Sequence, residues 1–140
     1  MPSVQTWTVT NYHLVENLPY NLENMCSLRM LRLSALPSLK QLSTSVGKLG
    51  QLEFLDISLC ESLEKLPKEI GELKKLKEFD MRECYHLRRF PSSVCGLSSL
   101  KHVSWNENIG DKWLQAKACP IPDLRVEIVE AQFTFPMLTF

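Results

Sequence analysis

Long apolar runs are absent from the sequence: nowhere do about eighteen apolar residues follow one another, so no transmembrane helix is expected. An excess of charge of either sign is also missing, because 16 basic residues balance 16 acidic ones. This balance gives no reason to expect a nucleic acid or an anionic membrane as the partner. The opening residues, Met1-Pro2-Ser3-Val4, lack the basic and then apolar segments of a secretory signal. We therefore expect a cytoplasmic chain, with the nucleus as a second compartment, that does not insert into a membrane.

The cysteines do not indicate a disulfide framework. There are five of them, an odd number, and no secretory signal precedes them. This combination favours reduced thiols. Cys60 and Cys84 are 24 residues apart, and we expect both to be buried as compact apolar side chains with a weak hydrogen-bond donor.

What the sequence does contain is a repeat of 24 residues. Valine or leucine recurs at positions 4, 28, 52, 76 and 100, and seven further columns follow in the same register. All 32 column positions in the first four units are apolar, counting cysteine and tyrosine. A period of 20–29 residues with the pattern L-x-x-L-x-L is the signature of leucine-rich repeats. Each unit therefore predicts one coil of a solenoid, and its apolar face is buried only when coils stack.

Each coil is predicted to contain one short strand and one short irregular or 3₁₀ segment. The strands are expected near residues 4–9, 28–33, 52–57, 76–81 and 100–105, stacked in parallel on the concave face. On the convex side, Pro67 and Pro91 suit the start of a short helix, and Gly71 and Gly96 suit its end. The predicted fold class is an α/β repeat, a leucine-rich repeat solenoid with a concave parallel sheet and a C-terminal cap.

The pattern divides the chain into three regions. Residues 1–106 carry the repeats, and residues 107–131 are predicted to form the cap, with a short helix at about 111–118 and a strand at Leu124–Ile128. Residues 132–140 form a divergent apolar tail. The first repeat is expected to begin at Val4, and we therefore expect no N-terminal cap before it. The open solenoid ends and the tail together predict that the isolated chain self-associates.

Alternation along each strand predicts which side chains face the concave surface. Asp56 is expected beside Asp80, with Arg32 and Arg82 flanking the two carboxylates and exposed Met30 and Phe54 nearby. Two interpretations remain open: a solvated charge ladder neutralised internally, or a docking spot for a basic residue of a partner. The predicted protein-binding residues are Met30, Arg32, Phe54, Asp56, Glu78, Asp80, Arg82 and His102.

No chemistry is expected at these positions. The cysteines and histidines with the closest spacing fall on different sides of a coil and match no known zinc arrangement: Cys84, His86, Cys95 and His102. The paired aspartates are expected on an open sheet, without a pocket that would shift their pKa. No G-x-S-x-G nucleophile motif occurs. We therefore predict a protein that is not an enzyme, with no catalytic residue, no metal site and no cofactor.

The coil from Leu52 to Leu73 resembles the repeats of plant intracellular nucleotide-binding leucine-rich repeat disease-resistance proteins. It follows their pattern L-x-x-L-x-L-x-x-C-x-x-L-x-x-L-P-x-x-I-G-x-L almost letter for letter. The segments Phe79–Cys84, Ser99–Val103 and Asp123–Glu127 are similar to the C-terminal end of the helper subgroup, the activated disease resistance type. The resemblance covers about residues 25–130. It implies a truncated or divergent piece of such a receptor.

For function, the resemblance implies a protein–protein interaction module of an immune receptor in plant defence. Its partners would be lipase-like immune signalling proteins or other domains of a receptor. The family's nucleotide-binding domain is not expected in this chain, because no G-x-x-x-x-G-K-[ST] occurs and Gly47-Lys48 is followed by leucine. The alternative is a vestigial or structural repeat fragment without a partner of its own.

Overall fold

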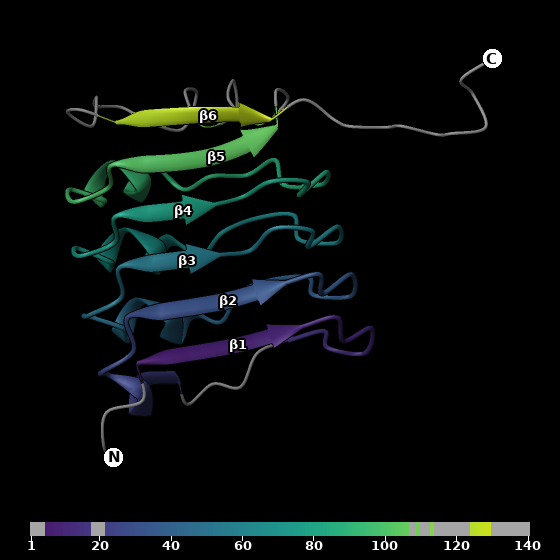
Figure 1. The fold of residues 1–140 in the computed structure, drawn as a ribbon, viewed down its shortest axis with the longest axis horizontal. Coiled ribbons are helices and arrows are strands. Elements are labelled where there is room, and N and C mark those ends of the chain that lie inside the picture. Colours follow the sequence, from purple (N-terminus) through teal and green to yellow (C-terminus); the bar gives the residue numbers. More distant parts are fainter. Residues whose placement is uncertain (1–4, 18–21, 107–108, 110–112, 114–123, 130–140) are drawn as a thin grey trace.

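The structure is a solenoid whose strands lie side by side in one sheet. The computed structural model describes residues 5–17, 22–106, 109, 113 and 124–129. Within these, six parallel strands follow one another in chain order (Figure 1). They are β1 (Thr6–Thr10), β2 (Met30–Ser34), β3 (Phe54–Asp56), β4 (Glu78–Asp80), β5 (His102–Asn106) and β6 (Arg125–Val129). The predicted solenoid with a concave parallel sheet is confirmed.

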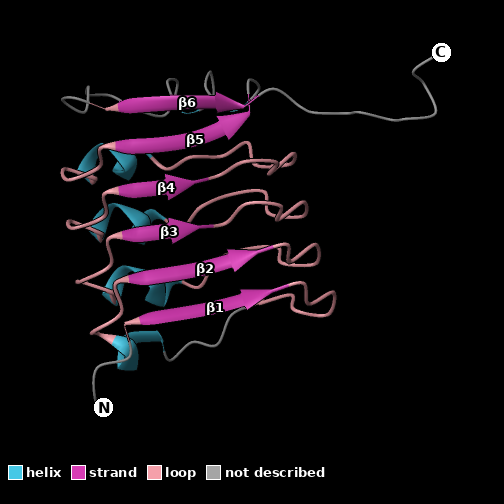
Figure 2. Ribbon diagram, in the orientation of Figure 1, coloured by secondary structure: helices cyan, strands magenta, loops and turns pink. Residues whose placement is uncertain are grey.

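Short 3₁₀ helices lie behind the sheet, as the cyan segments of Figure 2 show. The described helices of this kind are η1 (Leu22–Met25), η2 (Thr44–Lys48), η3 (Lys68–Glu72) and η4 (Ser92–Gly96). Pro67 and Pro91 stand directly before η3 and η4 in extended conformation, where the missing amide of proline costs nothing. In η2, which has no proline there, the Ser43 side chain accepts a hydrogen bond from the Ser45 amide. The predicted short convex segments are therefore confirmed.

Strand pairing keeps the register of the repeat. Leu31 lies beside Leu55, and Leu55 lies beside Phe79, so each partner lies one full repeat further along the chain. Between β5 and β6 the offset is shorter than the repeat by a single position, since Val103 pairs with Val126. The strand predicted at Leu124–Ile128 thus forms one residue later and extends the same sheet. Most of the predicted helix at about 111–118 lies outside the described residues.

The strands β1 to β5 begin two residues later than the sequence pattern predicts. For β2 to β5, the first leucine of the L-x-x-L-x-L pattern is the cause. The Leu52 amide donates to the Leu49 carbonyl, closing the turn that follows η2, so the strand can start only after it. Equivalent bonds join Leu28 to Met25, Leu76 to Leu73 and Leu100 to Leu97.

The apolar columns fill one continuous core. Leu55 and Leu76 are completely buried, as predicted. Cys60 and Cys84 are buried too, and their thiols donate to the carbonyls of Leu33 and Ile57, each at 2.9 Å. Burial raises the pKa of the Cys60 thiol to about 11. Both cysteines therefore act as the compact weak donors that the repeat predicts.

The glycines of the convex segments have a different role from the predicted one. No described glycine has a positive φ, so none ends a helix in the left-handed conformation that favours glycine. A Cβ on Gly71 would collide with the Ser93 carbonyl oxygen of the next coil, and one on Gly47 would lie 2.8 Å from the Glu69 carbonyl oxygen. Glycine is needed here because backbones of neighbouring coils approach closely.

Truncation of a central core residue should cost more stability than truncation at the first coil. We expect Leu55→Ala to lower the free energy of unfolding by about 2–5 kcal/mol through lost burial and a cavity. Trp7→Ala should cost less, since Trp7 is only half-buried against the core and repeat energies are largely nearest-neighbour. Urea titration of both variants measures the difference, and equal losses would contradict it.

Close approach of the convex segments can be tested with two glycines. Gly71→Ala is expected to destabilise the protein by about 1–3 kcal/mol, because the added methyl overpacks the contact with the next coil. Gly50→Ala is the matched control, since a Cβ there meets nothing within 4 Å, and it should stay within about 0.5 kcal/mol. Thermal unfolding followed by circular dichroism compares them, and an unchanged Gly71→Ala melting temperature would refute the explanation.

Candidate functional site

The concave face carries a groove of about 710 Å³ to which all six strands contribute. Seven of the eight predicted binding residues line it, whereas Met30 lies next to Phe54 in the sheet but outside the lining. The seven are Arg32, Phe54, Asp56, Glu78, Asp80, Arg82 and His102. The stacking of the coils therefore brings the predicted residues together on one surface.

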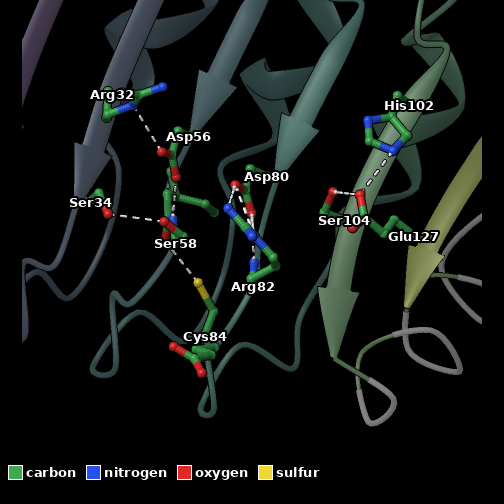
Figure 3. Close-up of polar contacts among 12 residues, drawn as sticks. Arg32, Ser34, Asp56, Ser58, Asp80, Arg82, Cys84, His102, Ser104 and Glu127 are labelled. Atoms are coloured by element: carbon green, nitrogen blue, oxygen red, sulfur yellow. Dashed lines mark hydrogen bonds and ion pairs between the residues drawn. The ribbon is translucent and has the colours of Figure 1, made fainter. Parts of the chain in front are cut away.

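The two aspartates are neutralised within the protein. Asp56 lies between Arg32 and Asp80 in the register of the sheet, as predicted. Arg32 Nε is 3.1 Å from Asp56 Oδ2, an ion pair without hydrogen-bond geometry. The Arg82 guanidinium donates two hydrogen bonds to the Asp80 carboxylate: Nε lies 2.9 Å from Oδ1, and Nη2 lies 2.7 Å from Oδ2 (Figure 3). Hydrogen bonding to Asp80 also raises the pKa of the Arg82 guanidinium.

The same carboxylates hold the backbone where β3 and β4 end. Asp56 Oδ1 accepts a hydrogen bond from the Ser58 amide at 2.8 Å, and Asp80 Oδ1 accepts one from the Arg82 amide at 3.1 Å. Such bonds to the residue two positions on are typical of aspartate in turns. Sequence reasoning missed this role, because the strands were expected to run to residues 57 and 81, one residue past each aspartate.

Each of the strands β1 to β4 is followed, within three residues, by one residue in the left-handed backbone conformation. Asn11, Ala35, Leu59 and Glu83 all have φ between 56° and 61°, a conformation that is costly for residues other than glycine. Interactions between coils compensate: the Leu59 amide donates to the Arg82 carbonyl at 2.9 Å. At the last such position the Glu83 amide donates instead to the Asn106 side chain at 2.6 Å. The rim of the groove is thus a connected hydrogen-bonded edge.

Two expectations about exposure are wrong. Asp56, expected to be solvated, is only 6% exposed, and Met30 and Phe54 are half-buried rather than exposed. Arg32 is one reason, because its guanidinium lies 5.5 Å from the Phe54 ring centre and also contacts Asp56. The sheet is therefore not the open surface without a pocket that alternation alone suggested.

The C-terminal half of the groove has a second polar group that the sequence did not predict. Glu127, on β6, lies 3.4 Å from His102 Nε2 and 3.4 Å from Ser104 Oγ (Figure 3). The pair with His102 is ionic only when the imidazole is protonated. Glu127 was missed because its segment was assigned to the cap, and only the pairing of β6 with β5 brings it onto the concave face.

The residues considered for zinc lie apart. Cys84 is buried in the core, Cys95 is half-buried on η4, and His102 faces the concave groove. Among the described residues, no group of three or more potential ligands could hold a metal ion. None of the helices in the described part of the chain has the length and apolar character that a bilayer crossing needs.

The double role of Asp56 predicts a difference between two substitutions. Asp56→Ala removes both the ion pair and the acceptor for the Ser58 amide, and should cost about 1–3 kcal/mol of stability. Asp56→Asn keeps an acceptor oxygen in place and should cost clearly less. Chemical denaturation of the two variants gives the comparison, and equal costs would show that the hydrogen bond to Ser58 contributes nothing.

A family model and one of two similar solved structures agree with this architecture. A family model described as a leucine-rich repeat region matches residues 8–116. A leucine-rich repeat protein of Leptospira interrogans is 20% identical with a TM-score of 0.53, and the match covers 88% of this chain and 36% of that one. The plant peptide hormone receptor RGFR1, solved in complex with RGF2, is 17% identical with a TM-score of 0.36, covering 90% of this chain and 29% of that one.

This chain spans about a third of the length of those two structures. A sequence search of curated proteins finds no match. Because the family model covers most of the sequence, and the strands β1 to β5 and the short convex turns follow the 24-residue repeat, the chain belongs to the leucine-rich repeat family, whose solenoids are typically non-catalytic scaffolds that bind proteins.

Proposed function

We propose that this chain binds a protein partner through its concave groove. The observation that carries the proposal is that one groove of about 710 Å³ collects an aromatic, several hydroxyls and both signs of charge from all six strands. Solenoids of stacked repeats offer such extended concave surfaces for binding. The ion pairs of Arg32 and Arg82 hold these side chains in place before a partner arrives, which lowers the entropic cost of association.

The more specific proposal is that the chain is part of a plant intracellular immune receptor, acting in defence in the cytoplasm or the nucleus. Its support is the amino-acid sequence of the coil from Leu52 to Leu73, which resembles disease-resistance repeats. The proposed partners are lipase-like immune signalling proteins or other domains of a receptor. Nucleotide binding is not part of the proposal, because the sequence contains no P-loop motif.

A second candidate is a structural or vestigial repeat fragment without a partner. The observation in its favour is that Asp56 and Asp80 are satisfied by their own arginines and by backbone amides, so their presence is explained without binding. Genomic context discriminates between the two candidates. An upstream reading frame that encodes a P-loop domain would favour the receptor.

A binding assay with concave and convex variants tests the proposal. We expect Phe54→Ser/Glu78→Lys to weaken binding to a purified lipase-like immune signalling protein by roughly tenfold or more, as loss of central contacts does. Lys68→Glu, on the convex η3, is the control and should bind like the natural protein. Biolayer interferometry gives the affinities, and circular dichroism confirms that each variant is folded. Equal affinities for all three proteins would argue against the concave face.

We also propose that the isolated chain self-associates through its end coils. Exposed large apolar side chains concentrate there: Tyr12 and Leu14 follow β1, and Val126 and Ile128 lie on β6 at 43% and 59% exposure. The residues paired with the latter two, Val103 and Trp105, are 0% and 3% exposed. β1 and β6 are also the edge strands of the sheet, which can pair with another chain.

Light scattering tests self-association. Val126→Lys/Ile128→Lys should shift the isolated chain towards the monomer, because charges at an edge strand oppose pairing. Removing residues 132–140 should also help, since this uncharged segment with phenylalanines is prone to aggregate. A natural chain that is monomeric and freely soluble would refute the proposal.

A further inference from the structure

The charges of the concave groove are not all compensated. Four carboxylates line it: Asp56, Glu78, Asp80 and Glu127. Three of them lie within an ion-pair distance of a basic side chain: Asp56 of Arg32, Asp80 of Arg82 and Glu127 of His102. In the described part of the chain, the Glu78 carboxylate alone among the four makes no ion pair or side-chain hydrogen bond, and Glu78 is exposed.

Apolar side chains lie on one side of Glu78. In the register of the sheet, Glu78 has Phe54 as its neighbour on β3, and Phe54 has Met30 as its neighbour on β2. Both apolar residues are half-buried, Phe54 with the Arg32 guanidinium over its ring, and the remaining exposed part of each is available for contact. On the other side of Glu78 lies His102, followed by Arg125.

The nearby cations leave Glu78 accessible. Arg32 is paired with Asp56, and Lys77 is paired with Glu53 at 3.0 Å. Arg125 is two strands from Glu78, or about 10 Å at the usual strand spacing. A second groove of about 800 Å³, lined by Glu78, Lys101, His102 and Arg125 among others, adjoins the first. Glu78 therefore lies where the two grooves meet and is exposed to solvent.

The spacing of these groups matches an extended peptide. Strands lie about 4.8 Å apart, so a point midway between Met30 and Phe54 is about 7 Å from Glu78. Alternate side chains on one face of an extended chain are about 6.7 Å apart. An apolar side chain resting on Met30 and Phe54 thus places the side chain two residues away at Glu78.

We propose that the groove, together with Met30 next to its lining, binds an extended segment in which an apolar residue lies two positions from a lysine or arginine. The apolar side chain packs on Met30 and Phe54, and the basic one pairs with Glu78. This inference rests on the proposed binding role of the concave face, and it moves the contact for a basic residue from Asp56 and Asp80 to Glu78. The reason is that both aspartates already have a guanidinium partner.

Fluorescein-labelled synthetic heptapeptides test the inference by anisotropy with the full chain. The parent peptides carry leucine and lysine two positions apart, in either order, within a glycine–serine background. Matched peptides replace the lysine by glutamine, replace the leucine by serine, or place the two residues next to each other. We expect each change to weaken binding. Replacing the lysine by glutamine should reduce the affinity about fivefold, as the loss of one exposed ion pair does.

Three protein variants locate the contact. Glu78→Gln should reduce binding of the lysine peptide about fivefold and abolish the preference for lysine over glutamine. Glu72→Gln is the matched control, because Glu72 is an exposed carboxylate at the end of the convex η3, and it should keep the full preference. Phe54→Ser should weaken all leucine peptides but leave the preference for lysine intact.

The outcomes separate the two proposals. If the lysine preference survives Glu78→Gln while Phe54→Ser weakens binding, the role of Glu78 is overturned and the concave face remains the binding surface. If neither variant changes peptide binding, both proposals fail. If none of the peptides binds at roughly 1 mM, the weak end of specific affinity, the role of Glu78 is overturned as well.

Discussion

A single coil of this chain has one apolar face and no second layer of its own to cover it. Stacking on the coils above and below completes the burial: Leu55, whose neighbours in the sheet are Leu31 and Phe79, is completely buried. Every other feature depends on this stacking. It requires parallel strands on one side, and on the other it brings convex backbones so close that Gly47 and Gly71 have no room for a side chain.

Stacking also determines the electrostatics of the concave face. Parallel strands in register place equivalent residues side by side, which puts Asp56 directly next to Asp80. Two adjacent carboxylates repel each other. Ion pairs with Arg32 and Arg82 offset this repulsion, and the same carboxylates accept hydrogen bonds from backbone amides at the strand ends. A rigid, largely neutral centre results, and beside it Glu78 keeps a carboxylate that no described cation pairs with.

The ends and the middle of the solenoid therefore offer different kinds of surface. The central groove is polar, with one apolar patch at Phe54, and suits selective recognition of an extended peptide segment. The edge strands instead expose apolar side chains such as Ile128 that the interior coils bury, and suit contact with another chain.

The sequence by itself determined the period, and with it the order of the coils. Apolar columns identify Leu55 and Leu76 as core, the alternation between them identifies Arg32, Asp56 and Asp80 as concave neighbours, and Pro67 marks the short convex turn. These assignments depend only on which residues are equivalent in successive coils, and the repeat period identifies the equivalent residues directly. Resemblance to disease-resistance repeats adds a proposed setting in a plant immune receptor.

Only the tertiary structure decided how closely the coils approach and which groups meet there. The need for glycine at Gly71 depends on the Ser93 carbonyl of the next coil, and the burial of Asp56 depends on where the Arg32 side chain lies. The hydrogen bond from Leu52 to Leu49 shortens β3 without any sign in the apolar pattern. Glu127 joins the groove only because β6 pairs with β5, at an offset that falls just short of the full repeat. A one-dimensional period records which positions correspond, whereas distances and hydrogen-bond partners arise when the coils are packed in three dimensions.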